Sequence, residues 1–475
     1  MKNCRNILSL LLIILFVSSG AKAGIRKGPE GRTKKELQFW LTDPSAGIYF
    51  QNQPCSGLLG SPVKGNSVIE VDVSQSYQTM DGFGNCLTDG SAILLTRMSS
   101  AARSALLKEL FGWDKNNIGI SYLRVSIGAS DLSEYPYTYD DLPEGQSDMD
   151  LKNFSLDPNR KDLIPVLKQI LKINPSIKIL GSPWSAPTWM KTNNNFKGGS
   201  LRKECFQVYA KYFVRYIQDM KKEGIPIDAI TIQNEPLHPG NNPSMYMTAE
   251  DQALFVKQDL GPAFHAAGLK TKIIVYDHNA NKPIYPLTIL RDPEAAKYVD
   301  GSAFHLYEGT IDALSDVHKE FPNKNLYFTE QWIGSPANFP GDLAWHTKTL
   351  IIGASRNWCK NVLEWNLASD PDCNPHTVGG CDRCLGTITL NGDQVTRNPA
   401  YYILAHAAKF ARPGSVRIAS GFVENLPNVA FKTATGNIVL IVLNESKETK
   451  KFFISGMGSA IEAELGKGAV GTFAW

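Results

Sequence analysis

Two glutamates stand where a short apolar run gives way to polar residues. Glu235 closes a run that begins at Ala229, and Glu330 closes a run that begins at Leu326. Runs of this length that are rich in Ile, Thr, Tyr and Phe are typical of buried strands, and catalytic groups of α/β barrels lie at the C-terminal ends of such strands. Two carboxyl groups held in this way can protonate a glycosidic oxygen and act beneath the sugar ring, which is the chemistry of a glycosidase.

The neighbours of the two glutamates suggest different roles. Asn234 could hydrogen-bond a sugar 2-hydroxyl, and Pro236 forces the chain out of the strand, so Glu235 is favoured as the acid/base. Glu330 lies near Trp332 at the end of a separate strand, and across a barrel mouth it could attack the anomeric carbon as nucleophile. A retaining mechanism of this kind requires carboxyl groups about 5–5.5 Å apart. An arbitrary glutamate at a strand end is usually solvated or salt-bridged. Whether this pair is catalytic therefore depends on the elements that position the two residues.

The elements expected to position the pair are repeated β–α units between about residues 78 and 409. Apolar runs predict strands at residues 80–86, 120–127, 177–184, 229–234, 272–277, 302–307, 326–329 and 361–367. So many regular units favour a closed (β/α)8 TIM barrel over a doubly wound sheet. Glu235 follows the fourth predicted strand and Glu330 the seventh, so barrel closure would bring both to one mouth.

The two ends of the chain have a different pattern. Residues 24–78 and 411–475 carry turn residues around strand-like runs, such as 67–73 and 438–443. We expect both ends to combine into one small β-sandwich beside a catalytic barrel at residues 79–410.

The first 23 residues have the features of a secretory signal. Lys2 and Arg5 precede an apolar stretch at residues 7–17, and Ala21-Lys22-Ala23 offers a small-x-small cleavage site. The apolar stretch is too short to span a bilayer comfortably, so we expect export to the periplasm or the extracellular space without stable membrane insertion. The formal net charge is +3, and the signal contains three basic residues and no acidic one. A nearly neutral mature chain argues against a nucleic-acid partner.

The cysteines predict a disulfide. Disulfides persist outside the cytoplasm, and an odd number of cysteines follows the signal, so at least one thiol stays free. These cysteines are Cys55, Cys86, Cys205, Cys359, Cys373, Cys381 and Cys384. The last three form a compact cluster with one Cys-x-x-Cys spacing. A zinc site would need a second close pair, so a disulfide that staples a loop is favoured, and no metal or other cofactor is expected.

Several segments, in chain order, resemble glycoside hydrolase family 30, the family of glucosylceramidases and β-1,6-glucanases within the retaining β-glycosidases of clan A. The segments are residues 81–85 with 88–89, 123–126 with 130–133, 182–193, 231–236, the Glu330 segment and 364–366. The resemblance spans roughly residues 40 to 475. It implies that Glu235 is the acid/base and Glu330 the nucleophile.

The resemblance also implies a set of residues that hold the glucose ring. These residues are Asp131, Trp184, Asn234 and Trp365, with Tyr307 near the nucleophile. The residue types suit the task, because an aspartate accepts two hydroxyls and an indole face stacks on the C–H face of a pyranose. The two tryptophans could also be plain packing.

Arg124 and His305 are further candidates for the site. Arg124 is expected to pair with Glu235 or Glu330 and to help set which carboxylate stays ionised, or else to form a structural salt bridge. His305 is open to the same two interpretations.

Two departures from the glucosylceramidases bear on the substrate. This chain has His305-Leu306-Tyr307 where they carry His-Trp-Tyr, and its loop at residues 370–384 looks unlike theirs. Such loops shape the site beyond the cleaved bond. The resemblance therefore implies a retaining hydrolase of β-glucosidic bonds, expected to be an endo-β-1,6-glucanase acting on a β-glucan. A glucosylceramidase or a β-glucosidase on small glucosides is the enzyme alternative, and a carbohydrate-binding protein without catalysis is the alternative from another class.

Overall fold

The computed structural model describes residues 37–54, 59–60, 67–114, 116–456 and 460–475. The predicted signal at residues 1–23 and Cys55 lie outside the described residues. Among the helices of the described part, none is long and apolar enough to cross a membrane.

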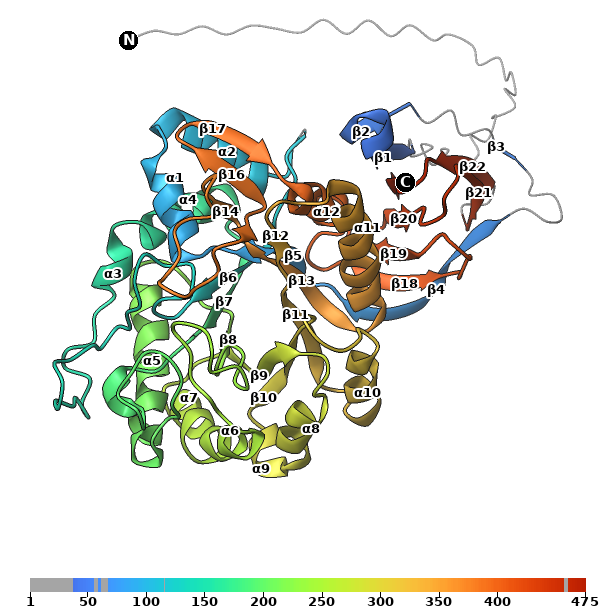
Figure 1. The fold of residues 1–475 in the computed structure, drawn as a ribbon. Helices are drawn as coiled ribbons and strands as arrows, with labels where there is room; N and C mark the ends of the chain where they lie inside the picture. The colour runs from blue at the N-terminus through green and yellow to red at the C-terminus, as the bar shows by residue number, and fades with distance from the viewer. Residues whose placement is uncertain (1–36, 55–58, 61–66, 115, 457–459) are drawn as a thin grey trace, which may run out of the picture. The chain divides into compact units, whose positions relative to one another are not determined.

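Eight parallel strands close into a barrel in the order β10-β11-β13-β5-β6-β7-β8-β9 (Figure 1). The strands are β5 (Gly82–Cys86), β6 (Tyr122–Ser126), β7 (Lys178–Ser182), β8 (Ala229–Thr231), β9 (Lys272–Asn279), β10 (Val299–His305), β11 (Asn325–Glu330) and β13 (Cys359–Asn366). Each coincides with one of the predicted strands, and the ends differ by a few residues. The predicted TIM barrel is confirmed.

Apolar side chains fill the barrel interior. The layer comprises Tyr122, Leu180, Ala229, Ile274, Ala303, Tyr327 and Leu363, all buried. Because both faces of each strand are covered, by this layer inside and by helices outside, the strands are near-continuous apolar runs in the sequence. The polar residues that end these runs therefore stand out as exceptions.

Several of the helices that cover the barrel are amphipathic. In α5 (Phe206–Lys222), Tyr209, Phe213 and Met220 are buried on one face, and the helix is followed by Gly224 at φ 82°. The other α-helices are α1 (Asp89–Arg97), α2 (Ser100–Phe111), α3 (Asp157–Arg160), α4 (Leu163–Ile173), α6 (Ala249–Phe255), α7 (Gly261–Ala266), α8 (Ile284–Arg291), α9 (Pro293–Ala296), α10 (Ala313–Glu320), α11 (Phe339–His346) and α12 (Pro399–Ala408).

Strands from both ends of the chain form the second domain. They follow the order β2-β1-β23-β20-β19-β18-β4-β21-β22-β3. Their bounds are β1 (Gln38–Asp43), β2 (Ile48–Gln53), β3 (Leu59–Gly60), β4 (Val68–Thr79), β18 (Val416–Ser420), β19 (Asn428–Lys432), β20 (Ile438–Leu443), β21 (Lys450–Ser455), β22 (Ala460–Leu465) and β23 (Val470–Ala474). Buried Ile69 of β4 packs in one cluster with Leu440 and Phe473 from the C-terminal strands. The β-sandwich built from the two ends of the chain is confirmed.

Two small sheets follow the seventh and eighth barrel strands. In the first, β12 (Ile333–Gly334) pairs with β15 (Cys384–Leu385). In the second, β14 (Ala368–Ser369) pairs with β16 (Ile388–Asn391), which pairs with β17 (Gln394–Arg397). These sheets arise from loops at the C-terminal end of the barrel, where Glu330 lies.

A disulfide joins Cys381 to Cys384, which confirms the predicted disulfide in this loop. Cys373, the third member of the cluster, is free and buried. The other free cysteines among the described residues are also buried, namely Cys86, Cys205 and Cys359.

Candidate active site

Glu330 is the last residue of β11 and is only 6% exposed. Its strand pairs with β10, and the register places Glu330 beside His305. Every residue of β11 after the first is buried, so the strand is fixed on both faces. Its terminal carboxyl group therefore projects from a rigid element at the barrel mouth.

Glu235 lies four residues beyond the end of β8, in a left-handed backbone conformation with φ 44°. Its N–H donates to the carbonyl of Asp277 (3.0 Å), and its carbonyl accepts from the N–H of His238 (2.8 Å). A non-glycine residue in this conformation costs about 1–3 kcal/mol, and such strain is retained mainly at functional sites. These backbone hydrogen bonds keep Glu235 in the strained conformation and so fix the direction of its carboxyl group.

The two carboxyl groups meet, although 95 positions separate them in the sequence. One carboxylate oxygen of Glu235, one of Glu330 and a ring nitrogen of His305 all lie within 4.8 Å of one another. This separation matches the close pair of a retaining glycosidase and leaves too little room for the water that an inverting enzyme holds between its carboxyl groups.

Arg124, in the middle of β6, is fully buried and contacts Glu330, not Glu235. Its Nη1 lies 2.5 Å from Glu330 Oε2, and its Nη2 lies 2.7 Å from Asp277 Oδ2. Nη2 also donates to Asn234 Oδ1 at 2.7 Å. The guanidinium therefore stabilises a negative charge on Glu330 and leaves the amide NH2 of Asn234 as the group that can donate to a sugar hydroxyl.

His305, the last residue of β10, lies between three carboxyl groups. Its Nδ1 is 3.2 Å from Glu235 Oε1 and 3.8 Å from Glu330 Oε1, and its Nε2 is 3.1 Å from Asp277 Oδ1. Burial alone would lower the pKa of this imidazole, but the carboxylates of Glu330, Asp277 and Glu235 outweigh burial and raise it to about 9. His305 is therefore a cation at neutral pH.

Asp277 is a member of the site that the sequence did not single out. It is fully buried in β9 and accepts hydrogen bonds from Arg124, Ser182, Thr231 and Thr329. Burial alone would raise its pKa, but the charges of Arg124 and His305 hold it well below the usual range. Asp277 lies where an apolar run gives way to polar residues, as Glu235 and Glu330 do, so the same signal could have found it.

The pKa values of the two catalytic candidates shift in opposite directions. Burial raises the pKa of Glu330, and the charges of His305 and Arg124 oppose that rise without cancelling it. Burial would also raise the pKa of Glu235, but the hydrogen bond and charge of His305 outweigh burial and lower it. The position of His305 therefore controls how one proton is distributed over the pair.

Tyr307 lies beside Glu330, as the family resemblance implies. Its hydroxyl donates to Glu330 Oε1 at 2.9 Å, and its backbone N–H donates to Asn279 Oδ1 at 2.9 Å. The side chain is 36% exposed. Glu330 thus receives donors on both oxygens, from Arg124 on one and from Tyr307 on the other.

The predicted sugar-binding residues border the same site. Trp184 and Trp365 face each other with ring centroids 5.4 Å apart, and Arg124 lies over the Trp184 ring at 4.7 Å. Burial and the charges of Glu330 and Glu235 raise the pKa of Asp131 to about 7. The structure therefore brings all nine predicted site residues to one end of the barrel.

His278 is a second group that sequence reasoning missed. It is 7% exposed, and its Nε2 lies 3.9 Å from Glu235 Oε1. Burial lowers its pKa to about 4, so it is neutral where His305 is charged. It directly follows Asp277, and no local sequence pattern distinguishes it from a surface loop residue.

The same cluster could geometrically ligate a metal ion through Glu235, Glu330 and His305. Two protein cations already balance its charge, however. Arg124 pairs with Glu330 and Asp277, and His305 holds a proton between the carboxylates. A cation here would have to displace that proton, so the donor set suits acid–base chemistry better than metal binding.

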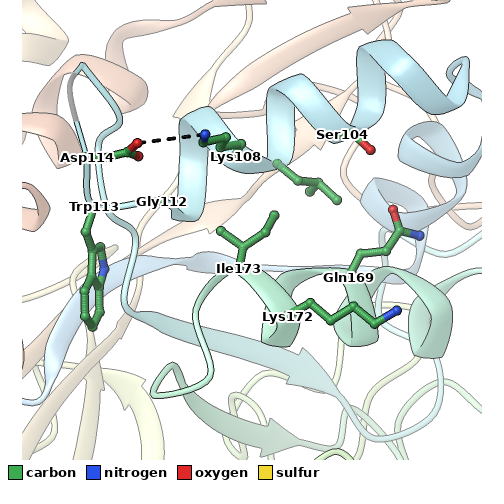
Figure 2. A pocket seen from close by; sticks show the side chains of 9 residues that line it. Ser104, Lys108, Gly112, Trp113, Asp114, Gln169, Lys172 and Ile173 are labelled. Atoms are coloured by element: carbon green, nitrogen blue, oxygen red, sulfur yellow. Dashed lines mark ion pairs between the residues drawn. The ribbon is translucent and has the colours of Figure 1, made fainter.

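A pocket of about 600 Å³ lies elsewhere, on the outer helices α2 and α4 (Figure 2). Trp113 and Ile173 line it, and Lys108 and Asp114 form an ion pair at 3.8 Å on its border. None of the nine predicted site residues lines this pocket.

The chain belongs to glycoside hydrolase family 30. The model of the family's TIM-barrel domain matches residues 80–411, and that of its β-sandwich domain matches residues 414–473. The chain is therefore a glycoside hydrolase with a glycan substrate, as the sequence predicts.

Individual relatives support the same placement. An endo-1,6-β-D-glucanase of Neurospora crassa is 34% identical over 87% of this chain and 87% of its own length. The lysosomal acid glucosylceramidase of Mus musculus is 31% identical over 86% of this chain and 82% of its own length. Among solved structures, an endo-β1,6-glucanase with 35% identity superposes with a TM-score of 0.86 and covers 92% of this chain and 99% of that one.

Proposed function

We propose that this protein is a secreted retaining endo-β-1,6-glucanase in which Glu330 is the nucleophile and Glu235 the acid/base. The observation that carries the proposal is the close carboxylate pair, within 4.8 Å, in which only Glu330 receives donors on both oxygens. The linkage is supported by relatives of 34 to 36% identity that carry the name endo-1,6-β-D-glucanase.

In the first step, the Glu330 carboxylate attacks the anomeric carbon as the bond to the glycosidic oxygen breaks. Glu235 gives its proton to that oxygen, and a covalent glucosyl-enzyme forms. Arg124 and Tyr307 favour the ionised form of Glu330 that attack requires. With Glu330 ionised, its charge favours a proton on Glu235, against the hydrogen bond and charge of His305, which lower the Glu235 pKa.

In the second step, ionised Glu235 takes a proton from water, which attacks the anomeric carbon and releases Glu330. Once Glu330 is esterified its charge is gone, so the pKa of Glu235 falls. The contact from His305 lowers it further and favours the base. One carboxyl group thus serves as acid and then as base because its neighbour's charge changes during the reaction.

The glucosyl ring is proposed to lie between the tryptophan pair and the polar groups on the opposite side. Trp184 and Trp365 supply the apolar wall, while Asp131 and the Asn234 amide NH2 bind hydroxyls. The leaving chain then extends over the loops beyond the barrel strands.

Export is part of the proposal. The predicted signal at residues 1–23 and the Cys381–Cys384 disulfide both fit an oxidising compartment outside the cytoplasm.

Matched substitutions of the two glutamates test the roles. Glu330→Gln should lower kcat by about 10⁴-fold or more on every substrate, because no covalent intermediate can form. Glu235→Gln should be equally poor on glucan but should still release an activated phenol from an aryl β-glucoside in a single burst, since that leaving group needs no proton. Circular dichroism of both variants, compared with that of the wild-type protein, checks that they fold. A burst from Glu330→Gln would reverse the assignment.

A substrate panel tests the linkage. Products from β-1,6-glucan, β-1,3-glucan and glucosylceramide are compared, with chain length followed over time. Internal cleavage of β-1,6-glucan alone is the expected result. Cleavage of the lipid alone would make the protein a glucosylceramidase, which the 31% identity to the mouse enzyme makes the main competing outcome.

A further inference from the structure

The Cys381–Cys384 disulfide lies against residues proposed to hold the glucosyl ring. Cys384 is 3% exposed and belongs to a buried cluster with Trp184 and Trp365. Gly380, beside Cys381 in the chain, lies directly against the backbone of Asp131, and the backbone N–H of Cys381 acts to lower the pKa of the Asp131 carboxyl group. The two ends of one disulfide thus contact the apolar wall and the hydroxyl-binding carboxylate of the same pocket.

One end of the disulfide is anchored to the segment that follows the nucleophile strand. In the β12–β15 pair, Cys384 stands opposite Gly334, four residues after Glu330. The N–H of Ser335 also donates to the carbonyl of Arg383 at 2.8 Å. Strand pairing therefore fixes the position of Cys384, and the disulfide bond restrains Cys381 to lie beside it.

The segment that leads to Cys381 packs closely against the backbone of Asp131. The N–H of Thr377 donates to the backbone carbonyl of Asp131 at 2.9 Å. A Cβ on Gly380 would lie only 2.4 Å from the same carbonyl oxygen, so this approach requires glycine. The loop therefore contacts the Asp131 backbone at Thr377 and Gly380, with no space for a side chain at Gly380.

We propose that the Cys381–Cys384 disulfide is a positioning element that keeps Asp131 and the tryptophan pair at the spacing that a glucosyl ring requires. The inference rests on the proposed function of this pocket. The disulfide takes no part in bond breaking, so its loss weakens binding of the sugar rather than the chemical step. Burial and the charges of Glu330 and Glu235 raise the pKa of Asp131, and the Cys381 N–H acts in the opposite direction, so it helps to keep Asp131 ionised as an acceptor for hydroxyl groups.

A double-mutant cycle with Asp131 tests the proposal. The double variant Cys381→Ser/Cys384→Ser, the variant Asp131→Asn and their combination are assayed on an aryl β-glucoside, whose sugar occupies only the glucosyl pocket. Loss of the disulfide should raise KM about tenfold, the value of one charge-assisted hydrogen bond, with kcat within about threefold. In the Asp131→Asn background, the same loss should raise KM less than about twofold, because the negative charge that strengthens the contact is already gone.

Cys373→Ser is the matched control. Cys373 is a buried free thiol in the same loop, so its substitution should leave KM and kcat unchanged. If the double variant fails to fold, the wild-type protein is treated with dithiothreitol under native conditions. Alkylation and mass spectrometry then identify the reduced cysteines, and KM is measured before and after reoxidation. The reduced protein should show the same increase.

An unchanged KM without the disulfide, or equal increases in both Asp131 backgrounds, would overturn the inference. These results are separable from the proposed function. A wild-type enzyme that hydrolyses the aryl glucoside but not β-1,6-glucan would refute the polymer assignment alone. An uncoupled cycle in an enzyme that cleaves β-1,6-glucan would refute the positioning role alone.

Discussion

Two buried histidines, one at the barrel mouth and one where the barrel meets the β-sandwich, have opposite charge states. Both are fully buried, and both ring nitrogens of each lie within hydrogen-bond distance of a partner. His305 faces the carboxyl groups of Glu235 and Asp277. His406, in α12, lies 2.8 Å from Thr42 Oγ1 of β1 and 2.8 Å from Thr472 Oγ1 of β23.

The hydrogen-bond partners decide whether each histidine is charged, since both side chains are equally buried. Carboxylates raise the pKa of His305 to about 9, whereas burial among hydroxyl groups lowers that of His406 to about 3. A charged imidazole can redistribute protons between the proposed catalytic carboxyl groups, whereas a neutral one can only join neighbouring elements through hydrogen bonds. The histidine at the barrel mouth is therefore charged and can take part in proton transfer. The histidine that contacts the β-sandwich is neutral, and its hydrogen bonds stabilise the fold.

The largest difference between the two histidines is expected in kcat/KM when each is replaced by glutamine. His305→Gln should lower kcat/KM on glucan by about 10²–10³-fold, because it removes the cation that balances Glu235 and Glu330. His406→Gln should leave kcat/KM within about twofold. Steady-state kinetics on both variants measure this, and equal losses would mean that His305 acts only as a structural residue.

A smaller effect is expected on stability in acid. The pKa of His406 is 6.5 when unfolded and about 3 when folded, so only the unfolded chain binds its proton in this window, and stability falls as pH drops from 6.5 towards 3. At pH 4.5 this amounts to about 2–3 kcal/mol. His406→Gln should therefore lose that much less unfolding free energy between pH 7 and pH 4.5. Urea titrations at both pH values measure it. An unchanged acid loss would show that His406 is already charged in the folded protein.

The smallest effect is expected on the pH profile. His305 lowers the pKa of Glu235, so His305→Gln should raise that pKa and move the basic limb of kcat/KM to higher pH, by about one unit. His406→Gln should not move the limb. A shift to lower pH in His305→Gln would indicate that the limb follows another group.

Local patterns were enough to predict much of this molecule. Glu235 and Glu330 stood out because polar residues ended apolar strands, and the strands were recognisable because parallel strands are buried on both faces. The contribution of both chain ends to one β-sandwich was also predictable from alternation and turn residues.

Other features depend on residues far apart in the chain. The sequence left open whether Arg124 pairs with Glu235 or with Glu330, because the chosen partner is 206 positions away. His278 was missed because only its distance to Glu235 makes it part of the site. Asp277 stands at the end of an apolar run, but its role depends on donors from four other strands.

The sequence by itself determined the barrel, the two carboxyl groups and the residue types around them, since each follows from short-range periodicity and side-chain chemistry. The tertiary structure alone decided the approach of those groups to within 4.8 Å and the charge of His305. It alone also placed the disulfide against Asp131 and the tryptophan pair. The reason is physical: a pKa and a binding geometry depend on distances across space, and those distances exist only once the barrel has closed.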